Sequence, residues 1–185
     1  MTPDEFRTLG HQLIEWVAAY RERLDGLPVM SPVGPGDVRR QFPTAPPEHG
    51  VPLAEVLPLL DRVILPGITH WNHPRFFAYF PSNSTLPSVL ADLVSAGLGA
   101  QGMSWQTSPA ATELEEVAME WLRQLVGLPE GFAGVLQDTA STATLVALLS
   151  ARERTTGLGQ RGGGLQASPE PLTVYASEMA HSSVE

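Results

Sequence analysis

The sequence of 185 residues contains no cysteine and no lysine, and all eleven of its basic residues are arginine. The absence of cysteine excludes disulfide bonds, thiolate nucleophiles and cysteine-ligated metals. The absence of lysine means that these residues alone cannot complete chemistry that needs a lysine amine, because the arginine guanidinium stays protonated at ordinary pH. No apolar run approaches the roughly 18 residues that a membrane span requires.

Positive charge is scarce, with 11 basic against 20 acidic residues and a net charge of -9. This balance argues against a nucleic-acid-binding protein. Residues 1–5 have neither the basic nor the apolar part of a signal peptide. We therefore expect a cytoplasmic protein with no nucleic-acid or membrane partner. The apolar fraction of 43% allows a sizeable buried core and argues against disorder over the whole length.

An amphipathic helix is predicted over residues 2–25. Thr2 and Glu5 fit a capping box, and Pro3 stands at the first helical position. Apolar residues recur at steps of three and four and form one stripe, namely Phe6, Leu9, Leu13, Trp16, Val17, Tyr20 and Leu24. This stripe requires a surface to pack on.

Proline dominates the part of the chain that follows this helix. Residues 27–52 contain seven prolines and three glycines, so we expect an extended connector without regular elements. Residues 53–65 read as a second helix, which Pro58 should kink or interrupt.

Five aromatic residues and two histidines, His70 and His73, are concentrated in residues 68–82. One interpretation is a buried strand or a hydrophobic corner. The other is an aromatic-walled pocket in which imidazoles and a tyrosine hydroxyl are polar points. The two histidines lie three residues apart and no third ligand follows at helical spacing, so no metal site is predicted.

The second half of the chain reads as alternating helices and strands. Two helices are expected, one over residues 86–98 and one that begins at Pro109 after the N-cap Ser108. Strands are predicted at residues 133–137 and 172–177. The strands flank a helix over residues 143–155 and a glycine-rich surface loop over residues 157–171, and a further turn and helix begin at residue 178. This order indicates a parallel α/β sheet, and because two strands cannot form one, the sequence resembles the first part of a larger fold.

The turn at residues 138–142 is the strongest local signal for chemistry. It joins a predicted strand to a helix N-terminus, where backbone N–H groups are unsatisfied and short side chains let an anion approach. A phosphate held by Thr139, Ala140 and Ser141 fits this pattern, and a plain capped helix fits it as well. His181 follows a predicted strand, at the sheet edge where open α/β folds bind ligands.

Four motifs in order carry a resemblance to a known family: HPRFFAYFPSNS (73–84), SWQTSPAATELE (104–115), QDTASTATLVALLSAR (137–152) and AHSSVE (180–185). They resemble the group II pyridoxal-phosphate-dependent decarboxylases, and among these the aromatic-L-amino-acid decarboxylases. The resemblance implies an α/β fold of the fold type I transferase class, of which this chain holds an incomplete part. Residues 1–82 would be a helical and extended segment that wraps around a second subunit, and residues 83–185 the first part of the cofactor-binding large domain.

The resemblance also assigns roles to residues. Thr139, Ala140 and Ser141 match the cradle for the phosphate of pyridoxal 5'-phosphate. His181 matches the catalytic histidine that stacks on the cofactor ring. The implied substrate-binding residues are Trp71, Tyr79, Phe80, Pro81, Ser82, Gln101 and Met103.

Several positions depart from the pattern of the family. Ser82 stands where aromatic decarboxylases usually have threonine, Asp138 where the family usually has glycine, and Thr142 where it usually has glutamate. Gln101 and Met103 stand where the partner subunit usually offers an apolar side chain and a phenylalanine. These two residues would make that side of the substrate pocket more polar and more flexible. The sequence therefore does not decide which substrate side chain is preferred.

The function that the resemblance implies is conversion of an aromatic L-amino acid to its amine and carbon dioxide by a cytoplasmic homodimer. The family carries a Schiff-base lysine and an aspartate for the pyridine nitrogen beyond the point that matches Glu185, so we expect the remaining C-terminal part to be a partner and this chain alone to be inactive. Three alternatives stay open: a non-catalytic dimerisation or docking module, a decarboxylase of acidic amino acids, and an aldehyde synthase of the same fold.

Overall fold

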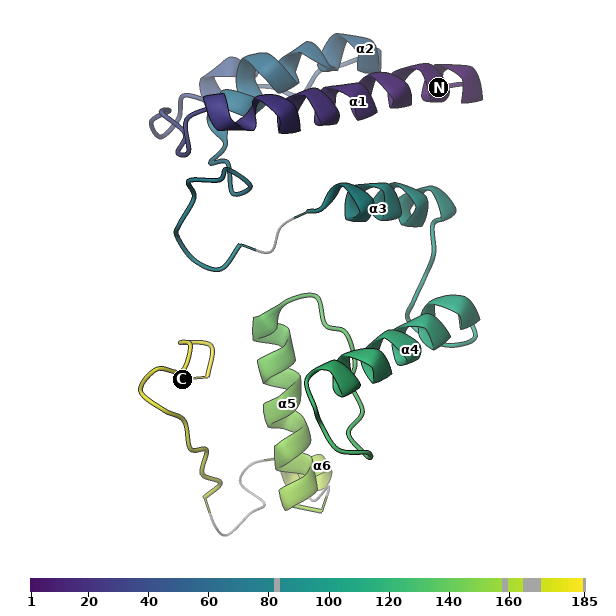
Figure 1. Ribbon diagram of the computed structural model, residues 1–185, viewed down its shortest axis with the longest axis vertical. Coiled ribbons are helices and arrows are strands. Elements are labelled where there is room, and N and C mark those ends of the chain that lie inside the picture. The colour runs from purple at the N-terminus through teal and green to yellow at the C-terminus, as the bar shows by residue number, and fades with distance from the viewer. Residues whose placement is uncertain (82–83, 158–159, 165–170, 185) are drawn as a thin grey trace. The chain divides into compact units, whose positions relative to one another are not determined.

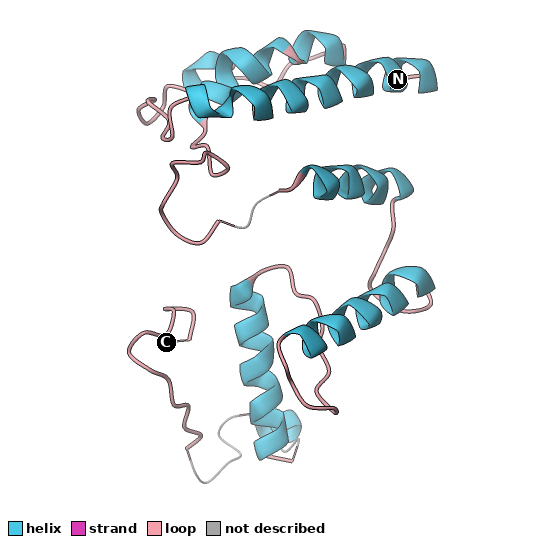
Figure 2. Ribbon diagram, in the orientation of Figure 1, coloured by secondary structure: helices cyan, strands magenta, loops and turns pink. Residues whose placement is uncertain are grey.

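The computed structural model describes residues 1–81, 84–157, 160–164 and 171–184, and in these ranges all regular structure is helical (Figures 1 and 2). The chain divides into two compact units, Met1–Val94 and Ser95–Glu185. Within the described ranges, no helix is both long enough and apolar enough to cross a membrane.

Helix α1, Pro3–Arg23, opens the first unit and begins with the predicted capping box. The Thr2 hydroxyl accepts the Glu5 amide at 3.2 Å, and the Thr2 amide donates to the Glu5 carboxylate at 2.7 Å. These two bonds satisfy helix-terminal groups that would otherwise need water. A 3₁₀ turn, Leu24–Gly26, continues α1 and carries the buried side chain of Leu24.

In the segment that follows α1, prolines limit regular structure and interrupt a helix, as the sequence predicts. Within residues 27–52 the only described regular element is a 3₁₀ turn, Arg39–Gln41, so the expectation of none was wrong by one turn. Helix α2 is short, Leu53–Val56, and ends just before Pro58, which cannot donate to the carbonyl four residues back. The chain then continues as a π-helical turn, Leu60–Ile64, and a 3₁₀ turn, Leu65–Gly67.

Polar contacts tie α1 to this interrupted helix. The Trp16 indole N–H donates to Asp61 at 2.9 Å, and Arg23 forms an ion pair with the same carboxylate at 2.6 Å. A groove of about 450 Å³ runs between the two elements and is lined by Gln12, Leu13, Trp16, Ala54, Leu57, Pro58, Leu60 and Asp61. Part of the α1 stripe therefore packs within its own unit, whereas Phe6 at its start is 59% exposed.

The remaining helices begin and end largely where their caps predict. Helix α3 spans Leu86–Leu98, and α4 spans Pro109–Leu125 with the Ser108 hydroxyl accepting the Ala111 amide. Gly127, at φ 74°, ends α4, and the amides of Leu128 and Gly127 donate to the carbonyls of Arg123 and Gln124. This is the Schellman arrangement, in which glycine takes the left-handed conformation without steric penalty.

Helix α5 spans Ala140–Thr155, so it begins three residues earlier than predicted, with Thr139 as its N-cap. A short helix α6, Gln160–Gly163, lies inside the predicted glycine-rich loop, and residues 158–159 and 165–170 of that loop lie outside the described ranges. Residues 178–184 form turns, where the sequence predicted the start of a helix.

The two predicted strands are not formed. Residues 133–137 and 172–177 belong to no β-ladder in the described ranges (Figure 2). A strand exists only where a neighbouring strand accepts and donates its backbone hydrogen bonds, and neither segment has such a neighbour here. One local bond anchors the first segment, because the Leu136 amide donates to the Glu115 carboxylate at 2.6 Å.

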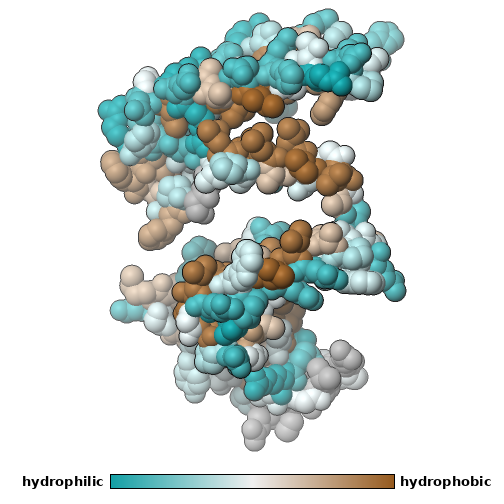
Figure 3. Space-filling view, turned by 45° about the vertical axis from the view of Figure 1, so that its right-hand side comes forward, coloured by the Kyte–Doolittle hydropathy of each residue, from teal (hydrophilic) through white to brown (hydrophobic). Residues whose placement is uncertain are grey.

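Large apolar side chains lie open to solvent in both units, and Figure 3 shows such surface over α3 and α4. Only three apolar side chains among the described residues are buried, those of Leu24, Val63 and Leu65. On α4 the predicted apolar face is exposed instead, with Trp121 at 65% and Leu125 at 84%. The described fold thus presents apolar faces that its own contacts do not cover.

We predict that Asp61→Asn lowers the free energy of unfolding by up to about 1 kcal/mol at neutral pH, the range of a half-exposed ion pair. The hydrogen bonds from Arg23 and Trp16 hold the pKa of Asp61 below its ordinary value of 3.8. The stabilisation is therefore present above that value and is lost as pH falls through the lowered pKa.

Urea unfolding at several pH values checks this prediction. The variant should lose less stability than the native chain on acidification from about pH 5 to about pH 2. Asp4→Asn is the matched control, because Asp4 is 91% exposed in its ion pair with Arg7 and should contribute little. Equal acid sensitivity of Asp61→Asn and the native chain would contradict the prediction.

Candidate active site

The first turn of α5 contains all three predicted phosphate-cradle residues. Thr139 is the N-cap, and its hydroxyl accepts the amide of Thr142 at 3.1 Å. The amides of Ala140 and Ser141 have no acceptor among the described residues, and both side chains are small and exposed. Two free donors at the positive end of a 16-residue helix form a site that can receive an anion.

Thr142 takes part in the N-terminal cap of α5. A glutamate three residues after the N-cap would complete a capping box. Thr142 instead places its hydroxyl 3.1 Å from that of Thr139, so the two threonines share one hydrogen bond. The cap is therefore closed by a short side chain, and the first turn of α5 contains no acidic residue, although the exposed Asp138 directly precedes the cap.

His181 lies beside a tight turn, and Ser183 contacts its ring at Nδ1. Its Nδ1 accepts the Ser183 amide at 3.1 Å and lies 3.0 Å from the Ser183 hydroxyl. A neutral ring that accepts at Nδ1 carries its proton on Nε2. The residue is exposed, so the ring face is open to a planar partner. Among the described residues no hydrogen bond or ring contact joins His181 to the first turn of α5.

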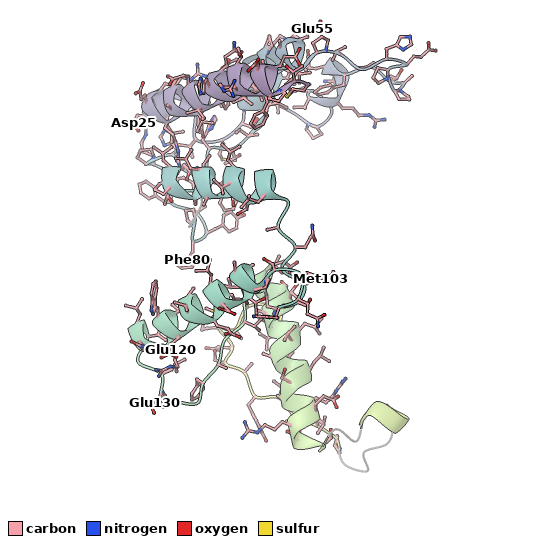
Figure 4. The ribbon with its side chains drawn as sticks, turned by 90° about the vertical axis from the view of Figure 1, so that its right-hand side faces the viewer. Asp25, Glu55, Phe80, Met103, Glu120 and Glu130 are labelled. Carbon is pink, nitrogen blue, oxygen red and sulfur yellow. The ribbon has the colours of Figure 1, made fainter. Side chains whose placement is uncertain are left out.

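The aromatic segment, which we define as residues 68–81, belongs to the first unit and consists of turns. It is not a buried strand, because Phe77, Tyr79 and Phe80 are 88%, 77% and 100% exposed. Figure 4 shows the Phe80 side chain extending from this loop. Trp71 stacks on Tyr79 with ring centroids 5.3 Å apart and planes at 16°, so two of the predicted substrate-binding residues are brought together.

The imidazoles of the aromatic segment are buried rather than open to a ligand. His70 and His73 are 2% and 3% exposed, and each accepts or shares a hydrogen bond at Nδ1, with the Tyr20 hydroxyl and the Arg75 amide. His73 Nε2 is buried without a hydrogen-bond partner among the described residues. The sequence analysis did not predict that the two histidines are buried and hydrogen-bonded within the first unit. The spacing of His70 and His73 carries no information about a contact with Tyr20, fifty residues away from His70.

Tyr79 adopts a left-handed backbone conformation, with φ at 57°. It is the only residue other than glycine with a positive φ in the described ranges. A bulky side chain in this region costs about 1–3 kcal/mol and persists where the surrounding contacts hold it. The stack on Trp71 is one such contact.

The remaining predicted substrate-binding residues are only partly placed. Pro81 is exposed, and Ser82 lies outside the described residues. Gln101 and Met103 belong to the second unit, where Met103 is 82% exposed and the Gln101 carbonyl accepts the Thr107 hydroxyl at 2.9 Å.

The fold is that of the N-terminal part of known decarboxylases. Tryptophan decarboxylase of Catharanthus roseus, solved in complex with L-tryptophan, superposes with a TM-score of 0.79 and 35% identity, over 85% of this chain and 35% of that one. The 4-hydroxyphenylacetaldehyde synthase of Rhodiola rosea superposes with a TM-score of 0.78 and 34% identity, over 89% of this chain and 36% of that one.

Sequence comparison leads to the same class. Aromatic-L-amino-acid decarboxylase of Bos taurus is 43% identical over 196 residues, which cover all of this chain and 40% of the bovine protein. Phenylacetaldehyde synthase of Arabidopsis thaliana is 41% identical over all of this chain and 38% of that protein. The family model described as pyridoxal-dependent decarboxylase conserved domain matches residues 35–185.

The chain belongs to the pyridoxal-dependent decarboxylase family, as its four motifs predicted. It spans about 40% of the length of these curated relatives.

We predict that Thr139→Ala destabilises α5 by about 1 kcal/mol, because the amide of Thr142 loses its acceptor. Thr144→Ala is the matched control on the same helix. Its hydroxyl donates only to the Ala140 carbonyl at 2.9 Å, and alanine is the better helix former. Amide hydrogen exchange over α5 should therefore accelerate in the first variant alone. Equal exchange in the two variants would show that Thr139 does not cap the helix.

Proposed function

We propose that this chain forms the cofactor-phosphate site and part of the substrate wall of a decarboxylase that converts an aromatic L-amino acid to its amine and carbon dioxide. The observation that carries the proposal is the first turn of α5, with two free amides and no acidic side chain. The same turn falls within the family match over residues 35–185.

The residues of this turn fit the phosphate of pyridoxal 5'-phosphate. The amides of Ala140 and Ser141 would donate to phosphate oxygens, and the Ser141 hydroxyl adds a third donor. Thr139 would contribute mainly by holding the turn, since its hydroxyl already accepts the Thr142 amide. When bound, the cofactor supplies an electron sink for the bond that loses carbon dioxide.

His181 would hold one face of the cofactor ring. The two contacts from Ser183 fix the rotation of the imidazole, which favours a defined stacking plane. Because Nδ1 is already an acceptor, Nε2–H is the group free to donate a hydrogen bond to the substrate or to the cofactor. Trp71, Tyr79, Phe80 and Pro81, with Ser82, would line the pocket for the substrate side chain, and Gln101 and Met103 would reach across to the substrate pocket of the second subunit.

The catalytic lysine must come from outside these residues, because the chain contains none. We propose that the complete enzyme joins this chain to a lysine-bearing C-terminal part and works as a homodimer in the cytoplasm. The exposed apolar side chains of α1 and α4, such as Phe6 and Trp121, support an assembly that covers them. Residues 1–82 would wrap around the second subunit, and residues 83–185 would begin the cofactor-binding domain.

An aldehyde synthase is the second candidate. Its support is the 41% identity to the phenylacetaldehyde synthase of Arabidopsis thaliana, which nearly equals the identity to the bovine decarboxylase. The product distinguishes the two functions, because a decarboxylase releases the amine and the synthase releases the aldehyde.

We predict that Ser141→Asp weakens retention of pyridoxal 5'-phosphate by the complete enzyme at least about tenfold, or about 1.4 kcal/mol. The new carboxylate would repel the phosphate, while an acidic residue in the first turn still favours the helix itself. Ser150→Asp, which adds the same charge on an exposed position of α5, is the matched control. Gel filtration followed by absorbance of the retained cofactor measures the effect, and unchanged retention in Ser141→Asp would refute the cradle.

We also predict that the complete enzyme prefers an aromatic amino acid to glutamate. The proposed substrate-binding residues include three aromatic side chains, and none of them is a basic residue that could bind the side-chain carboxylate of glutamate. Release of carbon dioxide is measured with each substrate, and amine and aldehyde are quantified in the same samples. A tenfold preference for glutamate, about 1.4 kcal/mol in the wrong direction, would exclude the aromatic substrate. The 185-residue chain alone should release no carbon dioxide in this assay, since it supplies no lysine amine.

A further inference from the structure

The backbone on both sides of Trp71 is fixed by the two buried histidines. The His70 amide donates to the Val29 carbonyl at 2.9 Å, and the His73 amide donates back to the His70 carbonyl at 3.0 Å. The His73 ring accepts the Arg75 amide at 3.0 Å. Trp71 therefore sits in a turn whose ends are held inside the first unit, although its own side chain is 41% exposed.

Helix α1 contacts this turn through the Tyr20 side chain. The Tyr20 hydroxyl lies 3.0 Å from His70 Nδ1, and the two rings are 5.6 Å apart at 40°. Burial raises the pKa of Tyr20 and lowers the pKa of His70, so both groups are neutral near pH 7. Trp16, one turn earlier on α1, stacks on the Tyr20 ring at 6.0 Å and 10°. The phenol is thus held on the helix and hydrogen-bonded to the aromatic segment.

Burial does not hold the aromatic wall in place. Tyr79 and Phe80 are almost fully open, and the described ring contact of Tyr79 is its stack on Trp71. Trp71 in turn contacts Phe76 at 5.0 Å and 34°. Because the Trp71–Tyr79 ring pair is not packed in a core, its position depends on the backbone that carries the rings. On the Trp71 side, that backbone is anchored at His70.

We propose that Tyr20 is a positioning residue for the substrate: from α1 it holds His70 and thereby fixes the Trp71–Tyr79 ring pair against which an aromatic amino acid packs. The inference rests on the proposed function, because it assigns Trp71 and Tyr79 to the substrate wall. Tyr20 itself would touch neither substrate nor cofactor.

The test removes one hydroxyl. Tyr20→Phe keeps the ring and its packing on Trp16, and is made in the complete enzyme. The probe is indole-3-propionate, which has an aromatic ring and a carboxylate but no amine, and its dissociation constant is measured by titration calorimetry. We expect this constant to rise about five- to tenfold, with affinity for pyridoxal 5'-phosphate changed less than about twofold. The KM for an aromatic amino acid should rise by a similar factor, with a smaller change in kcat.

Two further variants separate positioning from general stability. Asp61→Asn loosens α1 where Trp16 and Arg23 hold it, without touching the aromatic segment, and should leave the affinity for indole-3-propionate unchanged. His70→Asn keeps a polar atom near the position of Nδ1 and should retain most of the affinity. His70→Leu offers Tyr20 no polar atom and should lose as much affinity as Tyr20→Phe.

The outcomes distinguish this inference from the function on which it rests. If the unsubstituted enzyme binds the cofactor and indole-3-propionate, and Tyr20→Phe binds both equally well, the positioning role is wrong and the proposed function stands. Equal losses of probe affinity in Tyr20→Phe and Asp61→Asn would also overturn it, since they would show a general loosening of α1. If the unsubstituted enzyme binds neither ligand, both proposals fall.

Discussion

Backbone amide and carbonyl groups that a segment cannot pair within itself need a neighbouring segment, and this requirement shapes the whole structure. A helix pairs its own groups, so α1, α3, α4 and α5 form wherever the local sequence favours them. A parallel strand pairs nothing internally, so residues 133–137 and 172–177 form no ladder without partners. The exposed apolar faces on α3 and α4 follow from the same cause, because helices of an α/β fold bury those faces on a sheet.

In the first unit, polar side-chain contacts hold elements together that a larger apolar core would otherwise hold. Among its described residues only the apolar side chains of Leu24, Val63 and Leu65 are buried, and α1 is tied to later residues by Asp61 and His70. Each of these contacts joins positions 38 to 50 residues apart. A hydrogen bond contributes about 1 kcal/mol and a half-exposed ion pair up to about 1 kcal/mol, so such contacts define an arrangement more than they stabilise it.

The predictability of each feature follows from the range of the interactions that create it. The caps at Thr2 and Ser108 involve residues within about five positions, and the sequence predicts both. The early start of α5 was missed because Thr139 could be a turn residue or a cap, and only the bond to Thr142 decides. The left-handed Tyr79 and the Tyr20–His70 contact have no local signal, since they depend on segments brought together by folding.

The same distinction separates the two halves of the proposed chemistry. The proposed phosphate cradle consists of consecutive residues at one capped helix end, so its geometry is set by local bonds and needs no distant contact. The proposed aromatic wall would depend on the hydrogen bond between Tyr20 and His70, fifty positions apart, and on Tyr79 with its positive φ. On these proposals, a change on α1 would alter substrate recognition while the phosphate cradle would keep its shape. In the proposed site, binding of the phosphate would be robust to substitutions elsewhere in the chain, whereas the choice of substrate side chain would respond to substitutions on α1.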